Sequence, residues 1–491
     1  MKKSFEYIAF LAFFLVLFSE QASSQDHHYW NQLFGSRSAL MGGAVVGGVR
    51  DTSAGFYNPG ALGFINKPSL SVSANAYQLE RLSVEDAVGT GVPLDSDQIS
   101  VIPLLASGTL IFERFPDHAF GYSLLTKNQS TIELSGRSEK HLDLIGDVNH
   151  SDGRVSFQGE EDFIGQLITS SKVTELWAGL SWAHKLRPHI SMGATAFFAL
   201  RNQSQSETLT ARVVNGNTIA TADKVDYVDF WNIRTLLKWG ITADLEELKL
   251  GLTMTTSSRN LFGQGTVAGE RSFNNFYDPE QGQLVGELVS NRQENLDTTY
   301  KTPFSIAAGF ELALTPKTNL AGSVEWFHKQ REYDVITPGA HSFLRNIIVD
   351  ELIKFDETAE EEERALLQVK DAAERVVNFA VAIEHSFNKT TKGYLSFRTD
   401  HETNPNIEEN SLGLTNWDIY HFTVGTAFRR KRSELALGFT YSFGRPQEDF
   451  IQFANLSKIT EGNLFGNSKR TTANYDAFSV IVGYTYFFNK K

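Results

Sequence analysis

The chain has 491 residues, of which 41% are hydrophobic, 12% aromatic and 21% charged, and it carries a formal net charge of −13. It contains no cysteine, which excludes a disulfide scaffold, a thiolate metal site, a cysteine nucleophile and a lipid-modified cysteine anchor. Its acidic balance makes it a poor candidate for binding nucleic acid, because phosphates attract basic surfaces.

The first 24 residues have the features of a secretory signal peptide. Two lysines precede an apolar run from Ile8 to Phe18, and residues 22–24 are small, as a cleavage site requires. A helix needs ~20 residues to cross a bilayer, so this run is too short, and no later stretch is long enough. We therefore expect residues 1–24 to be removed, and we expect an exported chain without helical membrane spans.

The rest of the chain is dominated by a period of two, in which large apolar residues alternate with small or polar ones. This is the pattern of a β-strand with one apolar face. Small residues on one face suit a barrel lumen, and large apolar residues on the other face suit lipid. The pattern predicts about fourteen strands, near 68–78, 107–114, 119–130, 172–185, 189–201, 229–243, 248–258, 302–314, 318–331, 375–387, 391–400, 417–430, 433–445 and 477–488.

Short and long connections alternate between these segments, and the long ones fall at 79–106, 131–171, 202–228, 259–301, 332–374, 401–416 and 446–476. Outer-membrane barrels have short periplasmic turns and longer extracellular loops. Residues 67–491 are therefore predicted to form an all-β, 14-stranded antiparallel transmembrane barrel in the outer membrane of a Gram-negative bacterium. A large soluble β-sandwich is the alternative, and it would carry more charges on its wet face.

Residues 25–66 precede the first strand and hold a specific signal. A glycine-rich stretch that includes Gly42 and Gly47 ends in Asn58-Pro59-Gly60. Here the chain resembles the FadL/TodX family of outer-membrane transporters for long-chain fatty acids and other hydrophobic compounds. The resemblance rests on this stretch, on the strand number and on the length. The residue-level match is confined to about 35–65, and Gly60 stands where the family usually has alanine.

The resemblance implies that residues 25–66 fold into the lumen as a hatch. It also implies that the tip at residues 58–60, with Phe56 beside it, approaches a kink in the third strand where the barrel wall opens sideways. Gly121 is the glycine of that strand and the candidate for the kink. Without the family, the same Asn-Pro-Gly sequence would indicate a tight turn into the first strand.

The outer loops are expected to capture ligand. Leu344, Ile348 and Leu352 recur at helical spacing within 342–355, and a second helix is predicted over about 358–375. Phe262 lies in a second apolar loop segment. Such residues either collect hydrophobic ligand or pack against neighbouring loops.

Nothing in the sequence favours an enzyme, a cofactor or a metal site. The chain has no Gly-x-Ser-x-Gly elbow, its glycine run lacks dinucleotide-binding spacing, and its 12 histidines are scattered. Four charged residues fall on the predicted lumen face: Glu325, Glu384, Arg398 and Arg429. We interpret them as paired charges. The lesser alternative is that one of the arginines binds a ligand carboxylate.

The resemblance implies a passive, monomeric outer-membrane transporter for long-chain fatty acids or other hydrophobic small molecules, which leave by lateral diffusion through the barrel wall into outer-membrane lipid. One alternative is a non-enzymatic FadL-like barrel that acts as a partner in surface-protein secretion. Another is a general porin, which the N-terminal plug argues against.

Overall fold

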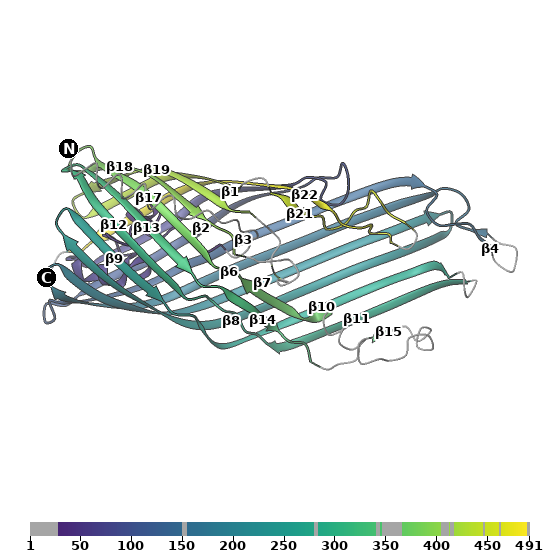
Figure 1. Ribbon diagram of the computed structural model, residues 1–491, viewed down its shortest axis with the longest axis horizontal. Helices are drawn as coiled ribbons and strands as arrows, with labels where there is room; N and C mark the ends of the chain where they lie inside the picture. Colours follow the sequence, from purple (N-terminus) through teal and green to yellow (C-terminus); the bar gives the residue numbers. More distant parts are fainter. Residues whose placement is uncertain are drawn as a thin grey trace.

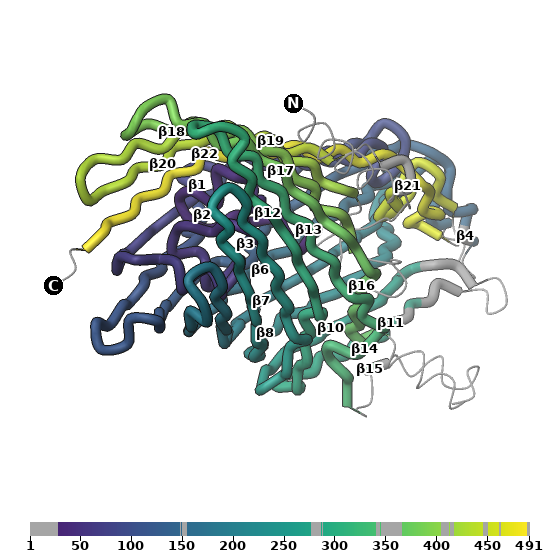
Figure 2. Tube along the Cα trace, turned by 60° about the vertical axis from the view of Figure 1, so that its left-hand side comes forward, coloured from purple at the N-terminus to yellow at the C-terminus, as the bar shows by residue number. Residues whose placement is uncertain are grey.

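The structure, a computed structural model, describes residues 28–149, 155–278, 283–339, 344–345, 366–403, 412, 417–444, 447–460 and 463–488. Fourteen antiparallel strands form a closed ring in which the last strand, β22, pairs with the first, β1 (Figures 1 and 2). In chain order the ring is β1 (Ser69–Val84), β2 (Leu94–Ile111), β3 (His118–Leu142), β6 (Glu161–Arg187), β7 (Ile190–Asn215), β8 (Thr218–Leu245), β9 (Leu248–Thr255), β12 (Ser305–Thr315), β13 (Thr318–Phe327), β17 (Val376–Ser386), β18 (Thr391–Asp400), β19 (Ile419–Arg430), β20 (Ser433–Gly444) and β22 (Arg470–Phe487).

The predicted barrel is confirmed, since each expected segment overlaps one strand of the ring. Strand β20 shows why the pattern was informative. Leu437, Phe439 and Tyr441 are exposed on the outer face, whereas Ala436 and Thr440 between them are buried. Alternation of this kind places apolar side chains toward lipid and small ones toward the lumen. Among the described residues, no helix is both long enough and apolar enough to cross a membrane.

The barrel wall is much taller on one side than on the other. Strands β6, β7 and β8 have 27, 26 and 28 residues, whereas β17 and β18 have 11 and 10. Figure 1 shows the long strands extending to the right beyond the short ones. Two further strands, β10 (Arg259–Asp278) and β11 (Gln283–Asp297), form a hairpin that continues this tall side, because β10 pairs with β8.

Several expected long loops are therefore strands. Residues 202–228 are not a loop, since β7 and β8 remain paired out to Asn215 and Thr218. Residues 259–301 are mostly the β10–β11 hairpin. The prediction missed these extensions because, above the membrane, the outer strand face turns polar and no longer carries large apolar residues. The inner face of β7 stays apolar, since Leu209, Ala211 and Val213 are buried there. Cross-strand ion pairs such as Lys224–Glu207, 2.7 Å apart, accompany the pairing there.

The smaller outer elements correct a second prediction. Strand β16 (Val369–Ala373) lies where the second helix was expected, and it pairs with β14 (Gln330–Ile336). Most of the two expected helices, including Ile348 and Leu352, lies outside the described residues. The remaining outer strands are β4 (Val148–Asn149), β5 (Val155–Ser156), β15 (Leu344–Arg345) and β21 (Gln447–Ile451).

Residues 28–66, here called the N-terminal segment, lie inside the ring. They include α2 (Ser36–Leu40), α3 (Ala54–Tyr57) and the 3-10 helix η1 (Pro59–Phe64). Hydrogen bonds join this segment to lumen-facing side chains on opposite sides of the ring, including Ser107 of β2, Thr195 of β7, Ser323 of β13 and Ser396 of β18.

The N-terminal segment also contacts the seam where the ring closes. The Ser36 hydroxyl lies 3.3 Å from the Ser71 hydroxyl of β1 and 3.0 Å from the Thr485 hydroxyl of β22. Ser71 and Thr485 are themselves 2.9 Å apart. Ser36 therefore links the first and last strands through one cluster of three hydroxyl groups.

Glycines of the barrel wall let the backbone of the N-terminal segment come unusually close. Gly193 pairs with Gly240 across β7 and β8, and Gly251 pairs with Gly309 across β9 and β12. A Cβ atom on Gly193 would lie 2.5 Å from the Pro59 carbonyl oxygen. These four glycines, here called the glycine seat, thus accommodate main chain where any larger residue would overlap it.

A methyl group in the glycine seat should displace the N-terminal segment. In Gly251→Ala the new Cβ would overlap the Val46 carbonyl oxygen and lie 2.7 Å from Asn58 Nδ2. We expect a loss of about 1–3 kcal/mol in the free energy of unfolding, measured by denaturant titration in detergent, with faster proteolysis of residues 28–66. Gly121→Ala is the matched control, because its Cβ would make only ordinary 3.5 Å contacts. Equal effects of the two variants would contradict the glycine seat.

Candidate functional site

Buried ion pairs fix one side of the N-terminal segment to the barrel wall. Arg37 Nε donates to Glu384 of β17 over 2.6 Å, and its Nη2 donates to Glu311 of β12 over 2.8 Å. Arg50 also pairs with Glu311, and Lys392 lies 3.0 Å from Glu384. Both carboxylates are buried, so a missing partner would leave an uncompensated charge. We call these five side chains the ion-pair anchor.

Asn58 fixes a second point of the segment. Its side-chain oxygen accepts a hydrogen bond from Gly60 N at 3.0 Å, which caps η1. Its Nδ2 donates to the carbonyl oxygens of Val46 and of Ile241 in β8. Asn58 therefore joins two parts of the N-terminal segment to the wall beside the glycine seat.

The ring of strands has a break between β2 and β3. These strands pair only from Leu105–Leu125 to Ile111–Ala119, while residues 94–104 continue with β1 and residues 126–142 continue with β6. Two side chains reach across the break: Thr126 Oγ1 donates to the Pro103 carbonyl oxygen, and Ser96 Oγ accepts from Glu133 N. We call this break the β2–β3 gap.

Local sequence explains where the gap begins. Pro103 has no backbone N–H for a ladder, and it lies two residues beyond the last β2–β3 pair. In β3 the pairing with β6 shifts register between Thr126 and Asn128, so Lys127 forms a bulge. The two strands thus diverge at the same level of the barrel.

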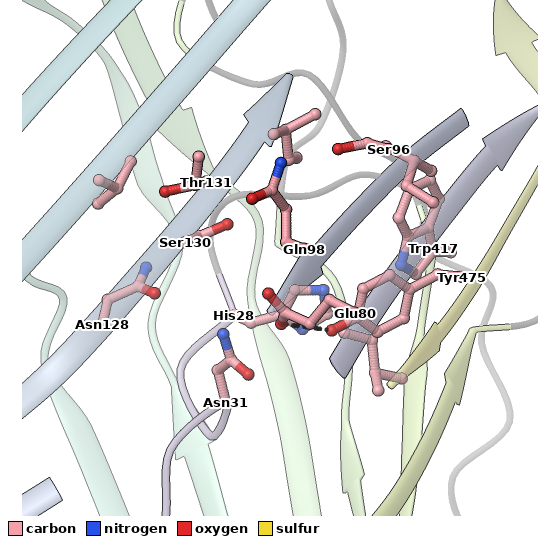
Figure 3. A pocket seen from close by; sticks show the side chains of 14 residues that line it. His28, Asn31, Glu80, Ser96, Gln98, Asn128, Ser130, Thr131, Trp417 and Tyr475 are labelled. Carbon is pink, nitrogen blue, oxygen red and sulfur yellow. Dashed lines mark hydrogen bonds between the residues drawn. The ribbon is translucent and has the colours of Figure 1, made fainter. Parts of the chain in front are cut away.

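A small cavity of about 50 Å³ lies against the inner side of this gap. Figure 3 shows Asn128, Ser130 and Thr131 on one strand opposite Gln98 and Ser96 on another, with His28 and Asn31 close by. Glu80 and Tyr475 close the far wall, where the Tyr475 hydroxyl donates to Glu80 over 2.9 Å. The cavity therefore connects the gap with the N-terminal segment.

Residues 28–31, here called the N-terminal strap, run past this cavity and are held by polar contacts from both sides. Lys127, the bulged residue of β3, donates to the Tyr29 carbonyl oxygen. Arg398 Nη2 of β18 donates to the Asn31 carbonyl oxygen over 3.0 Å. Trp30 Nε1 donates to Glu325 over 2.8 Å. The strap is therefore attached to β3 on one side and to β13 and β18 on the other.

His28 adds a charge contact to the strap. Its ring nitrogens lie 3.4 Å from carboxylate oxygens of Asp400 and Glu402. Burial disfavours the charged ring, but the two carboxylates outweigh this effect and raise the pKa of His28 to about 10. His28 is therefore cationic at neutral pH and is attracted to the outer end of β18.

An aromatic cluster lies beneath the strap. Phe56 packs edge-on against Phe34 and contacts Trp177 and Phe197 of the wall, with ring centroids 4.6, 6.2 and 6.4 Å away. Buried leucine and isoleucine side chains of β2 and β3 next to the gap belong to the same cluster: Ile102, Leu104, Leu105 and Leu125. An apolar surface thus continues from the lumen to the base of the gap.

The structure places the predicted site residues in different parts of the molecule. Asn58, Pro59 and Gly60 contact β7, β8 and β9. The 3-10 helix that Pro59 begins also contacts β3, where Leu62 approaches Gly121, so the approach of the tip to the third strand stays a prediction. Phe56, in contrast, lies near the Lys127 bulge, whose ammonium group is 5.8 Å from its ring centroid. The strand irregularity falls at Lys127 and not at Gly121, where β3 stays in register.

The predicted capture residues do not meet in one place within the described parts of the chain. Phe262 is exposed on the outer face of β10 beside Trp231, and Leu344 is exposed in β15. Of the expected lumen charges, Glu384 is paired, and Arg429 is exposed near a short turn, where it stacks on Phe487. Arg398 is buried, and no carboxylate of the described residues lies within ion-pair distance of it.

Sequence reasoning missed Lys127 and the ion-pair anchor. Lys127 had a usable signal, because it is the one lysine within the predicted third strand, and a charge in a membrane strand usually has a role. The anchor had none, since Arg37 and Glu384 lie 347 positions apart. In the described part of the chain no group of acidic and histidine side chains could hold a metal ion.

Solved structures match this fold, although sequence comparison finds nothing: no family model and no curated protein matches the chain. A FadL homologue from Pseudomonas aeruginosa has a TM-score of 0.58 at 12% identity, covering 94% of this chain and 100% of its own. The toluene transporter TodX from P. putida has a TM-score of 0.53 at 12% identity, with 93% and 99% covered. The monoaromatic hydrocarbon channel CymD has a TM-score of 0.54 at 10% identity, with 93% and 98% covered. At these identities the likeness establishes a common fold.

Removing Arg37 should loosen the N-terminal segment. In Arg37→Met two buried carboxylates lose a partner, which should cost about 3–5 kcal/mol in the free energy of unfolding. Hydrogen exchange of residues 36–51 should rise in the same variant. Arg81→Met is the control, because the Arg81–Asp97 pair is exposed and should contribute little. Unchanged exchange in Arg37→Met would contradict the anchor.

Proposed function

We propose that this protein is a passive outer-membrane transporter of hydrophobic small molecules, which pass between the lumen and the membrane through the β2–β3 gap. The observation that carries the proposal is the break in the ring at residues 94–104 and 126–142, with a cavity directly behind it. In a membrane barrel unpaired strand edges occur only where they line a cavity or are covered by protein. A break at this position therefore favours a lateral path.

The outer rim of the gap is apolar, which suits such a path. Ile99 and Val101 of β2 are 72% and 60% exposed, and Tyr77 of the neighbouring β1 is 63% exposed. Together with the aromatic cluster around Phe56, they form apolar surfaces on both sides of the wall. A hydrophobic molecule that moves laterally avoids contact with water, so the step needs no energy source.

The N-terminal strap has to shift for ligand to pass. A cavity of about 50 Å³ is far smaller than the ~300 Å³ of ordinary ligand pockets. The ion-pair anchor and Asn58 hold residues 37–60 in place, whereas the strap lies beside the cavity itself. We infer that ligand displaces the strap while the rest of the N-terminal segment stays seated.

We further infer that the ligand carries an anionic head, as a long-chain fatty acid does. Nε and Nη1 of Arg398 are buried and have no hydrogen-bond partner among the described residues. Four more cationic side chains lie on the lumen face of β3, β7 and β8, where the single carboxylate Glu175 pairs with both Arg201 and Arg234. These four cations are Lys127, Arg201, Arg234 and Lys238.

Filling the gap should stop transport. Ser130 lines the cavity, so Ser130→Trp should lower uptake of a radiolabelled long-chain fatty acid into proteoliposomes by about tenfold or more, as a block of the lateral path requires. Leu124→Trp is the matched control, because Leu124 is exposed on the outer face of the same strand where β2 and β3 are still paired. Normal uptake by a folded Ser130→Trp barrel would rule out the lateral path.

Removing the Arg398 guanidinium should weaken binding of an acid but not of an alcohol. Hydrogen bonds to charged groups contribute about 1.5–3 kcal/mol, so Arg398→Leu should reduce equilibrium binding of a long-chain carboxylate about ten- to a hundredfold. The alcohol of equal chain length should bind as before, and Arg429→Leu should change neither. Equal losses for acid and alcohol would contradict the head-group assignment. No binding of either by the folded wild-type barrel would instead favour the secretion partner.

A further inference from the structure

The cavity behind the β2–β3 gap has a polar lining, in contrast with the apolar outer rim of the gap. Uncharged polar side chains of the N-terminal strap, β2 and β3 line it: Asn31, Ser96, Gln98, Asn128, Ser130 and Thr131. A pure hydrocarbon that passes here would remove these groups from water without replacing their hydrogen bonds, which is unfavourable. The lining therefore favours a ligand that brings hydrogen-bonding groups of its own.

Two lining side chains hold buried polar atoms without a hydrogen-bond partner in the described ranges of the chain. Trp417 is 1% exposed, and its Nε1, which can only donate, is one of these atoms. The other is Oδ1 of Asn128, which can only accept. Figure 3 shows the two side chains on opposite sides of the cavity, with Trp417 beside Tyr475. The cavity thus has an unused donor on one wall and an unused acceptor on the other.

A secondary amide complements this pair of atoms. Its carbonyl oxygen accepts a hydrogen bond, its N–H donates one, and in the trans form the two groups point in opposite directions. An amide with its carbonyl toward Trp417 and its N–H toward Asn128 satisfies both buried atoms. An ester has the carbonyl acceptor but no donor, so it satisfies Trp417 alone.

Arg398 lies next to this cavity. Its Nη2 donates to the carbonyl oxygen of Asn31, a lining residue. It also pairs with His421 of β19, which follows shortly after Trp417 in the chain. Glu80 lines the cavity and would repel a carboxylate placed inside it. A ligand carboxylate is therefore favoured at Arg398, a short distance along the molecule from an amide beside Trp417.

We propose that the preferred ligand is an N-acyl amino acid, in which a long acyl chain is joined through an amide to a carboxylate. The carboxylate binds Arg398, and the amide lies in the cavity between Trp417 and Asn128. The acyl chain extends through the gap past its apolar outer rim, so the ligand enters lipid with its chain first. This assignment rests on the proposed function and names the substrate class for the same path.

The test compares equilibrium binding of three radiolabelled ligands to the full-length barrel in detergent. N-palmitoylglycine has the amide, O-palmitoylglycolate has an ester in its place, and palmitate has neither. A hydrogen bond that satisfies a buried group should strengthen binding about three- to tenfold. The wild-type barrel should therefore bind the amide about three- to tenfold more tightly than the ester, and about tenfold or more tightly than palmitate.

Two variants separate the two contacts. Trp417→Phe removes the donor and should lower the preference for N-palmitoylglycine over palmitate about three- to tenfold. Asn128→Leu removes the acceptor and should abolish the preference for the amide over the ester. Trp231→Phe is the matched control for the indole, because Trp231 lies beside Phe262 on the outer face of the wall, and it should leave every ratio as in the wild type.

Equal binding of all three ligands by the wild-type barrel would overturn this assignment and leave the proposed function standing. Unchanged ratios in either variant would overturn it as well. If Trp417→Phe does not fold, the comparison of amide with ester in the wild type and in Asn128→Leu still decides. Absence of binding for all three ligands by a folded barrel would overturn both the assignment and the proposed function, so the two failures are distinguishable.

Discussion

Backbone hydrogen bonding in lipid is the constraint on which the rest of this structure depends. Water is absent from the bilayer core, so each strand must find a partner on both edges, and a ring of strands is the solution. The main exception among the described strands is the outer part of β2 and β3, which is not paired. This unpaired part of the wall is covered on its lumen side, because Lys127 at the bulge binds the N-terminal strap. The weakest part of the wall and the internal segment therefore form one unit.

The same constraint explains why the barrel could be predicted from sequence. Lipid imposes apolar side chains on one face and a narrow lumen imposes small ones on the other, so β20 and β22 show a period of two. Where water replaces lipid, that requirement ends. The outer half of β7 carries polar residues on its outer face, and its apolar inner face is short (Leu209, Ala211 and Val213), so its sequence resembles that of a loop. The strand β16 has five residues and is too short for a period to be recognised.

The site was predictable only in outline. The glycine-rich stretch and Asn58-Pro59-Gly60 indicated a specialised segment before the first strand. Their neighbours could not be derived, because a contact between Asn58 and Gly240 depends on barrel register and not on local pattern. Gly121 was a reasonable choice for the irregularity in β3, since glycine tolerates a kink. The bulge instead lies at Lys127, whose side chain is held by the strap, so tertiary contact decided its position.

The cluster of Ser36, Ser71 and Thr485 has a consequence for how the chain folds. Ser36 precedes every strand and contacts both strands at which the ring closes, so docking of the N-terminal segment and pairing of β1 with β22 stabilise each other. The enclosed segment therefore contributes to closure of the wall as well as filling the lumen.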